Sequence, residues 1–214
     1  MGAVAVTGRI IGCDADIAEG AAWLAMAEPR FADILPRLTP LPLRRKPDGC
    51  AALMQAIMGQ QVSVASATAI WDRLVDAELT TPDAILRVSQ DDLRGLGLSR
   101  QKAKYVQALA EANIDFNGLQ DVSDVEVIKI LTAINGIGAW TAQVYAMFSL
   151  GRADVFAPGD LALQEGARMI FDLPARPDAK QVATMAIAWS PWRSVAARII
   201  WAYYGATKKR DGIL

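Results

Sequence analysis

The stretch "INGIGAWTAQVYAMFSLGRADVFAPGD" (Ile134 to Asp160) holds two glycines separated by one residue, a nearby tryptophan and a final aspartate. Glycine permits positive φ angles and close backbone approach, so Gly136 and Gly138 predict a tight turn with Ile137 pointing inward. A helix that starts directly after such a turn has first N–H groups without intrahelical partners. These groups suit a phosphate and are indifferent to base sequence. An ordinary turn between two helices is the alternative.

The composition narrows the possible chemistry. The 214 residues suffice for one large domain or two small ones, and a hydrophobic content of 53% predicts a folded core rather than disorder. The chain has no histidine, and Cys13 and Cys50 are its only cysteines. These counts exclude Ser-His and Cys-His catalysis, a Cys/His zinc quartet and a cysteine-ligated iron–sulfur cluster. Acid–base chemistry therefore falls to Asp, Glu, Lys or Tyr.

The net charge of −1 taken alone argues against a nucleic-acid-binding protein, although only the contacting face must be positive. Basic residues form three clusters, for which solvated surface is the alternative: Arg44, Arg45 and Lys46; Arg100, Lys102 and Lys104; Lys208, Lys209 and Arg210. No apolar run approaches the roughly 20 residues of a membrane span, and the N-terminus lacks a secretory signal pattern. We expect a soluble, cytoplasmic protein without membrane contact.

Helix signals recur along the chain, whereas no segment has the alternation and turn chemistry of a β-hairpin. Thr81 is typical of an N-cap, and Ser89–Asp92 and Ser123–Glu126 have capping-box spacing. Ser190-Pro191 predicts the start of a late helix with Trp192 on its apolar stripe. We therefore predict an all-α fold of roughly ten short helices.

Three ordered motifs resemble the helix–hairpin–helix DNA glycosylase superfamily. "GIGAWTA" followed by Asp160 in "VFAPGD" is similar to the family's hairpin and its Gly/Pro-rich loop with a catalytic Asp. "LMQAIMGQQVSVASATAIWDRL" (Leu53–Leu74) resembles the family's early helix pair with a Gly-Gln-x-Val-Ser turn. "WSPWRSVAARIIW" (Trp189–Trp201) resembles the terminal segment of the DNA-3-methyladenine glycosylase II branch. The similarity extends from about Asp16 to Tyr204.

The resemblance implies two helical lobes around a cleft. Residues 49–155 would form the central bundle, with the helix–hairpin–helix motif at 131–150. Residues 1–48 and 156–214 would form the other, discontinuous lobe. The cysteine cluster of some relatives is missing, and the chain is too short for their N-terminal β-rich domain. We expect the minimal, wholly helical form, acting as a monomer.

Within this resemblance Asp160 is the predicted catalytic residue. Its carboxylate would stabilise the positive charge that develops on the deoxyribose as a flipped-out base leaves. The alternative is that Asp160 only caps the helix that follows it. Asp154 is the nearest rival but matches no catalytic position. Bifunctional members carry a lysine where this chain has Trp140, so no amine can form a Schiff base and we expect a monofunctional enzyme.

The resemblance assigns Trp140 and Trp201 to the walls of a base pocket, with burial in the core as the alternative for each. Trp201 lies about 180° around its helix from Trp192, so one face would pack in the core and the other would line the cleft. Val144 stands where some relatives have a tyrosine, and Tyr145 points about 100° away from it. Both complete the predicted pocket. Aromatic walls favour a cationic base such as 3-methyladenine, whose departure requires no general acid.

Gln61 is the predicted plug for the gap left by an extruded base, with a helix-capping turn around Ser63 as the alternative. Trp189 and Arg193 are expected to brace the cleft wall or the DNA backbone. The predicted DNA contacts besides Gln61 are Ser63, Gly136, Gly138, Ala139, Thr141 and Arg193. A Na⁺ or K⁺ ion is expected on the backbone carbonyls of Thr132, Ile134 and Ile137, and no cofactor is expected to be required.

These observations predict a monofunctional DNA glycosylase that removes alkylated bases from double-stranded DNA by base flipping. The chief substrate would be 3-methyladenine, with 7-methylguanine as a second. Two alternatives stay open. One is a glycosylase for uracil, hypoxanthine or a mismatched thymine, and the other is a non-catalytic hairpin module that only binds DNA.

Overall fold

The computed structural model describes residues 8–208. This part of the chain consists of α-helices, short 3-10 turns and their connections. Its β-type pairing is limited to one isolated bridge, between Ile10 and Arg152. The predicted all-α fold is confirmed. Within the same range, no helix combines the length and apolar character that crossing a membrane requires.

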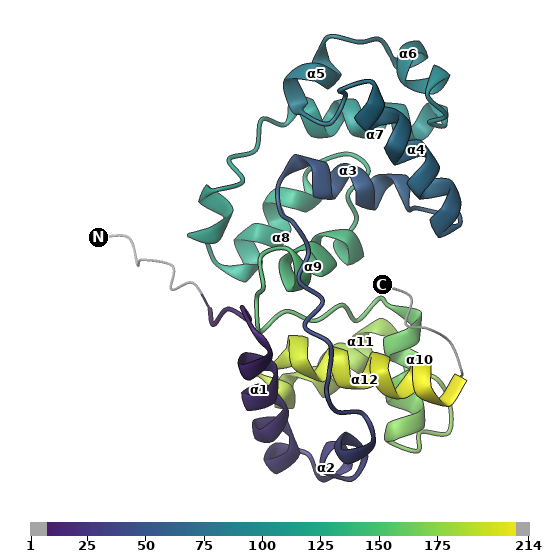
Figure 1. The fold of residues 1–214 in the computed structure, drawn as a ribbon. Coiled ribbons are helices and arrows are strands. Elements are labelled where there is room, and N and C mark those ends of the chain that lie inside the picture. Colours follow the sequence, from purple (N-terminus) through teal and green to yellow (C-terminus); the bar gives the residue numbers. More distant parts are fainter. Residues whose placement is uncertain (1–7, 209–214) are drawn as a thin grey trace. The chain divides into compact units, whose positions relative to one another are not determined.

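The chain divides into two compact units (Figure 1). Among the described residues, unit 1 comprises 46–145 and unit 2 combines 8–45 with 146–208. The helices that begin in unit 1 are α3 (Cys50–Met58), α4 (Val64–Asp76), α5 (Pro82–Leu86), α6 (Gln90–Gly95), α7 (Arg100–Glu111), η2 (Gly118–Gln120), α8 (Asp124–Thr132) and α9 (Ala139–Phe148). Those of unit 2 are α1 (Asp14–Ala27), α2 (Pro29–Ile34), η1 (Leu35–Arg37), α10 (Leu161–Ile170), α11 (Ala179–Met185), η3 (Ala186–Trp189) and α12 (Arg193–Lys208).

The boundaries between the units lie at 45/46 and 145/146, whereas the sequence places lobe boundaries at 48/49 and 155/156. The end of α9 and the loop after it pack within unit 2. There the Ser194 hydroxyl oxygen lies 2.5 Å from the carbonyl oxygen of Arg152 and 2.8 Å from that of Val155, and its single proton is shared between these two acceptors. The loop that leads toward Asp160 is therefore built on α12. A cleft between lobes stays a prediction.

Trp189 is the centre of an aromatic cluster in unit 2. Its side chain is buried, and its ring centroid lies 5.4 Å from that of Phe31 and 5.5 Å from that of Phe156. The Phe171 ring stacks on it at 5.9 Å. Aromatic pairs at such separations stabilise a core beyond their burial alone. Trp189 thus packs in the interior of unit 2 and does not present its ring to a DNA backbone, whereas the expectation that it braces a cleft wall stays a prediction.

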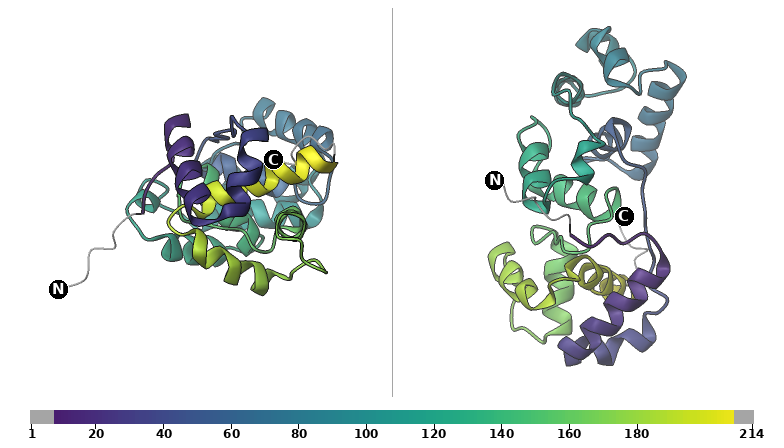
Figure 2. Two further views of the ribbon diagram at one scale, coloured as in Figure 1. Left: turned by 90° about the horizontal axis from the view of Figure 1, so that it is seen from below. Right: turned by 90° about the vertical axis from the view of Figure 1, so that its left-hand side faces the viewer.

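Helix α12 is buried along most of its first half. Every residue from Ser194 to Trp201 is buried, because α10 and α1 both pack against this helix. Figure 2 shows α12, in yellow, beside α1, in purple. The helix begins at Arg193, so Trp192 precedes it. The expectation of aromatics on opposite helical faces is therefore wrong, and both Trp192 and Trp201 are buried.

The capping signals of unit 1 are mostly confirmed. The Thr81 hydroxyl accepts a hydrogen bond from an N–H in the first turn of α5. Ser89 and Asp92 form the reciprocal box at the start of α6, with bonds of 2.9 and 3.1 Å. These local bonds satisfy N–H groups that have no partner within the helix. The starts of both helices are thus set by residues next to them in the sequence.

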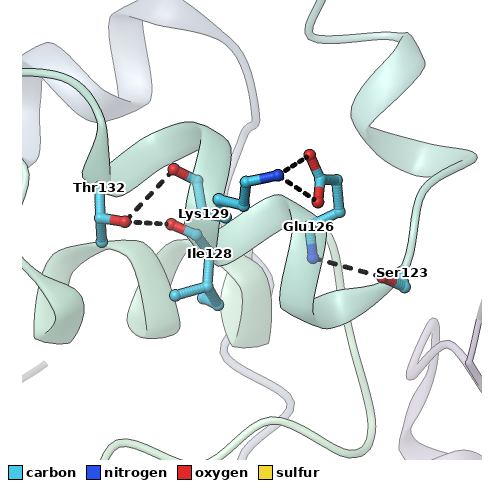
Figure 3. Close-up of polar contacts among 5 residues, drawn as sticks. All are labelled: Ser123, Glu126, Ile128, Lys129 and Thr132. Atoms are coloured by element: carbon cyan, nitrogen blue, oxygen red, sulfur yellow. Dashed lines mark hydrogen bonds and ion pairs between the residues drawn. The ribbon is translucent and has the colours of Figure 1, made fainter.

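The third cap forms only in part (Figure 3). Ser123 accepts a hydrogen bond from the N–H of Glu126 at 3.3 Å, which starts α8 as expected. The Glu126 carboxylate accepts instead from Lys129, at 3.1 and 3.2 Å. The predicted reciprocal box is replaced by an ion pair one helical turn along, because Lys129 offers a charged donor within reach.

Gly20 tests the packing of α1 against the start of α12. A Cβ atom at Gly20 would lie 2.6 Å from the ring of Trp192 and 2.7 Å from a methyl group of Val195. We expect Gly20→Ala to lower the free energy of unfolding by about 1–3 kcal/mol through overpacking. Gly95→Ala in α6 is the control, since no described heavy atom lies within 4 Å of its Cβ position. Thermal unfolding provides the measurement. A Gly20→Ala variant with the melting temperature of the wild type would contradict the prediction.

Candidate active site

Asp160 is the N-cap of α10, and its carboxylate is held by three N–H donors. Oδ1 accepts from the backbone N–H groups of Ala162 and Leu163, both at 2.9 Å. The indole Nε1 of Trp201 donates to the same oxygen at 3.2 Å. Asp160 therefore does cap the helix, which was the alternative to catalysis. The two roles are compatible, because the side chain is only half-buried.

The three bonds leave the carboxylate little freedom to rotate. Hydrogen bonds to an ionised acceptor are stronger than those between neutral groups, and Oδ1 of Asp160 receives all three. The N-terminus of α10 adds a favourable dipole for a negative charge. The arrangement presents one anionic group in a fixed orientation beside an indole. A site of this kind can stabilise developing positive charge without reorganising during the reaction.

A layer of aromatic and cationic groups supports Trp201 from behind. The ring of Phe148 lies 5.7 Å from that of Trp201 at an interplanar angle of 33°. The guanidinium of Arg198 lies 4.7 Å from the Phe148 centroid and donates to the carbonyl of Leu43 at 3.0 Å. This packing fixes the plane of the indole. It also explains why Trp201 is buried while its Nε1 still reaches Asp160.

Phe148 and Arg198 are absent from the residues selected on sequence. Arg198 interrupts the apolar run from Val195 to Trp201, which was an available signal of a buried, satisfied charge. Burial lowers its pKa, and the positive charges of Arg44 and Arg45 lower it further. Phe148 had no such signal, because a phenylalanine near the end of an apolar helix is typical of any core.

The predicted pocket residues of unit 1 differ in exposure. Trp140, in the first turn of α9, is 38% exposed, so it is not an ordinary core tryptophan. Val144 and Tyr145 are buried, and the Tyr145 hydroxyl oxygen accepts from the N–H of Gly49 at 2.8 Å. Burial raises the pKa of Tyr145 to about 12, although the bond from Gly49 acts in the opposite direction. Tyr145 thus joins α9 to the start of α3, and its place in a base pocket stays a prediction.

The hairpin between α8 and α9 has the conformation that its glycines predict. Gly136 has a φ of +97°, and a Cβ atom there would clash with the ring of Tyr105. Ile137 is 3% exposed and therefore points inward. The N–H of Ala142 donates to the carbonyl of Gly138 at 3.0 Å, so α9 starts directly after the turn. The first N–H groups of α9 then face away from the helix, as the phosphate hypothesis requires.

The two hairpin glycines have different reasons to be glycine. Gly138 lacks a positive φ, and no described heavy atom lies within 4 Å of its Cβ position. The fold therefore does not demand glycine there, whereas close approach by a ligand would. Ala139 beside it is exposed, while the Thr141 side chain is buried. Of the two, only Ala139 presents its side chain to solvent.

The turn between α3 and α4 carries the predicted plug. Gln61 is exposed and has a φ of +58°, an uncommon conformation for a residue other than glycine. Ser63 caps α4 by accepting from the N–H of Ser66 at 3.2 Å. The capping alternative is therefore correct for Ser63 and leaves Gln61 available. Gln60 was not selected on sequence, yet its side-chain amide donates to the carbonyl of Gly136 at 3.1 Å.

Asp154, the rival carboxylate, is engaged elsewhere. It accepts from Arg193 through both oxygens, at 2.7 and 2.8 Å, and from the Ser190 hydroxyl at 2.7 Å. Burial acts to raise the pKa of Asp154, but the bonds from Arg193 and Ser190 and the charge of Arg193 outweigh it and lower the pKa. A DNA phosphate at Arg193 would have to compete with this ion pair.

The basic clusters do not all lie on the surface. Arg100 and Lys104 are exposed, but Lys102 is buried and donates to the carbonyl of Met58 at 2.7 Å. Burial lowers the pKa of Lys102. Of the third cluster, Lys209 and Arg210 lie outside the described residues. Within residues 8–208, no group of three or more Cys, Asp or Glu side chains is arranged to hold a metal ion.

Residues 54–194 match the model of the HhH-GPD superfamily of base excision DNA repair proteins. The chain belongs to this superfamily. It is 31% identical over 176 residues to the putative DNA-3-methyladenine glycosylase YfjP of Bacillus subtilis, covering 76% of this chain and 61% of that protein. The chain thus spans less than two thirds of the length of that relative.

Solved structures of the superfamily share the fold. A crystal structure of a DNA-3-methyladenine glycosidase from Bacillus halodurans has a TM-score of 0.78 and 32% identity, with 90% of this chain and 91% of that chain covered. A 3-methyladenine DNA glycosylase from Schizosaccharomyces pombe, in complex with abasic DNA, has a TM-score of 0.73 and 26% identity, with 89% and 97% covered.

Gly138 provides a test of the phosphate hypothesis that does not disturb the fold. We expect Gly138→Ala to keep the melting temperature of the wild type, because its Cβ position is open. Affinity for duplex DNA should fall about tenfold, since the methyl group would obstruct an approaching phosphate. Fluorescence anisotropy with a labelled duplex measures the affinity, with Gly95→Ala as the control. Unchanged affinity in Gly138→Ala would argue against a phosphate at this hairpin.

Proposed function

We propose that this protein is a monofunctional DNA glycosylase that hydrolyses the N-glycosidic bond of alkylated bases in double-stranded DNA. The chief substrate would be 3-methyladenine, and 7-methylguanine the second. The proposal rests on one observation above the others, the hydrogen bond between the indole of Trp201 and the carboxylate of Asp160. It places an electron-rich ring and a fixed negative charge side by side in a member of a base excision repair superfamily.

Asp160 would act on the sugar. A base inside a duplex must leave the stack before its bond to the sugar can be reached. As that bond breaks, the deoxyribose acquires oxocarbenium character. A carboxylate already oriented by three donors stabilises this charge, and it can orient the water that attacks C1′. The water supplies the hydroxyl group at C1′ and loses its other proton to solvent, and the base leaves with the electrons of the broken bond.

Selection of the base would be partly electronic. A purine methylated at N3 carries a positive charge, so its departure requires no proton from a general acid. This agrees with a chain that has no histidine. A cation over an indole gains about 0.5–2 kcal/mol, which favours the charged lesion over a normal base. Trp140 and Trp201 are the proposed walls, and Val144 and Tyr145 complete the proposed pocket.

The enzyme would leave the DNA backbone intact. Cleavage of the backbone by bifunctional relatives requires an amine that forms a Schiff base with the sugar. The corresponding position in this chain is Trp140, which has no such group. The product would therefore be an abasic site, and the protein would act as a monomer on one lesion at a time.

Contacts with DNA would come mainly from unit 1. The backbone N–H groups that follow Gly136 and Gly138 are the proposed phosphate ligands, with Ala139 and Thr141 in the same helical turn. Gln61 would occupy the gap left by the extruded base, with Ser63 beside it, and a polar plug can also pair with the orphaned base. In unit 2, Arg193 is proposed to brace the DNA backbone from its ion pair with Asp154.

A Na⁺ or K⁺ ion is proposed at the backbone carbonyls of Thr132, Ile134 and Ile137. These carbonyls lie at and after the C-terminal end of α8, where carbonyl groups lack intrahelical partners. The Ile134 carbonyl accepts from the N–H of Ile137 at 3.1 Å, which leaves it a second lone pair. Backbone carbonyl oxygens are the kind of ligand that a monovalent cation takes, and the charge of such an ion would add to the attraction for a phosphate.

Asp160→Asn separates catalysis from capping. Asparagine is as good an N-cap as aspartate, and its carbonyl oxygen can still accept from Ala162, Leu163 and Trp201. We therefore expect a nearly unchanged melting temperature and unchanged DNA binding. Release of 3-methyladenine from methylated DNA should fall at least about a hundredfold, because the negative charge is lost. The rate is measured under single-turnover conditions by mass analysis of the free base.

Asp160→Ala is the companion variant. It should lose activity to the same extent and also lose about 0.5–2 kcal/mol of stability with the cap. Full activity in Asp160→Asn would reduce Asp160 to a helix cap.

A panel of duplexes with single lesions tests the substrate, and release of uracil but not of 3-methyladenine would replace the proposed substrate. Failure of the wild type on every lesion would favour a module that only binds DNA.

A further inference from the structure

We infer that Gln60 is a positioning residue that ties the Gln61 turn to the hairpin and so controls insertion of the plug. The inference deepens the proposed function and rests on it. The motif "GQQVS" contains two adjacent glutamines with opposite environments. Gln60 is half-buried and donates to the carbonyl of Gly136 at 3.1 Å, whereas Gln61 is exposed. One glutamine holds the turn and the other is presented to the solvent.

The backbone conformation explains how adjacent residues come to point in different directions. Helix α3 ends at Met58, and the chain reverses through the turn that follows. Gln61 adopts a φ of +58° within it. Residues other than glycine keep such a conformation only where surrounding contacts impose it. The bond from Gln60 to Gly136 is a contact of this kind, immediately before the strained residue.

Helix α7 contacts both the end of α3 and the hairpin that Gln60 joins. The Nζ atom of Lys102 donates to the carbonyl of Met58 at 2.7 Å, at the end of α3 where a positive charge is favoured. One turn further along α7, the ring of Tyr105 packs against Gly136. Residues three apart lie on the same face of a helix. The end of α3 and the hairpin therefore rest on a common support, and Gln60 joins them directly.

This frame has a consequence for base extrusion. A side chain that enters a base stack must separate stacked bases, which costs free energy. The turn that carries this side chain must therefore keep its conformation during insertion. The hairpin is the natural anchor, because the proposed phosphate ligands of the protein start there. Gln60 would fix the position of the Gln61 turn relative to the hairpin, which is the segment proposed to bind the DNA backbone. Loss of Gln60 should impair insertion of the plug much more than binding of the duplex.

The test compares Gln60→Met with Gln107→Met. Methionine keeps the length of the side chain and removes the N–H donor. Gln107 is the matched control, because its side-chain amide also donates to a backbone carbonyl in unit 1, that of Val88, at 3.2 Å. The probe is a duplex with a tetrahydrofuran abasic analogue opposite 2-aminopurine. Its fluorescence reports a side chain entering the gap and does not depend on base release.

For Gln60→Met we expect the fluorescence change on binding to be largely lost. Single-turnover release of 3-methyladenine should slow about tenfold, as expected for one lost hydrogen bond. Affinity for undamaged duplex should change less than about threefold. Gln107→Met should match the wild type in all three measurements. Gln60→Ala, judged by the same measurements, replaces Gln60→Met if the latter does not fold.

Two outcomes would overturn the inference. One is a Gln60 variant with the fluorescence change and release rate of the wild type. The other is an equal loss in Gln107→Met, which would indicate a general effect on unit 1. The proposed function fails separately, if the wild type releases no methylated base. Loss of the fluorescence change in the Gln60 variant would then still support its role in positioning Gln61.

Discussion

The hydrogen bonds that converge on one oxygen of Asp160 are the constraint on which the proposed site depends. They join the start of α10 to the middle of α12, two helices that pack closely in unit 2. Removing the carboxylate would leave two N–H groups of α10 and the indole N–H of Trp201 without this hydrogen-bond acceptor. The same residue therefore sets a helix start, the orientation of Trp201 and the position of a negative charge. Helix stability and the proposed chemistry would thus be combined in a single side chain.

Trp201 can serve beside that charge because its other contacts are already fixed. A tryptophan without such contacts could adopt other orientations in the core, and its hydrogen bond to Asp160 would then be incidental. Here Phe148 supports the ring and Arg198 supports Phe148, while the Arg198 guanidinium is satisfied by backbone carbonyls. A buried charge that is held by hydrogen bonds to backbone carbonyls is costly to remove. The indole thus rests on a support that resists displacement by a base.

Most short-range contacts could be predicted from the sequence, whereas long-range packing could not. The caps at Thr81 and Ser89 depend on residues within one turn, and they form as expected. The sequence predicts the start of α12 at Ser190-Pro191, whereas the helix begins at Arg193, and the sequence carries no sign of the aromatic cluster that buries Trp189. This cluster joins segments far apart in the chain, because it draws on α2 and on the loop before α10. Periodicity carries no signal for such partners.

The same distinction applies to the site. Asp160, Gly136 and Gln61 could be selected because the motif and its residue types narrow the choice, whereas Gln60 could not. A glutamine in a turn has many possible partners, and only the fold shows that its amide reaches the hairpin. In the proposed mechanism the base leaves without a general acid, so the rate would depend on where charges and hydrogen-bond donors are held. The residues that only hold these groups in place would then matter as much as the carboxylate itself.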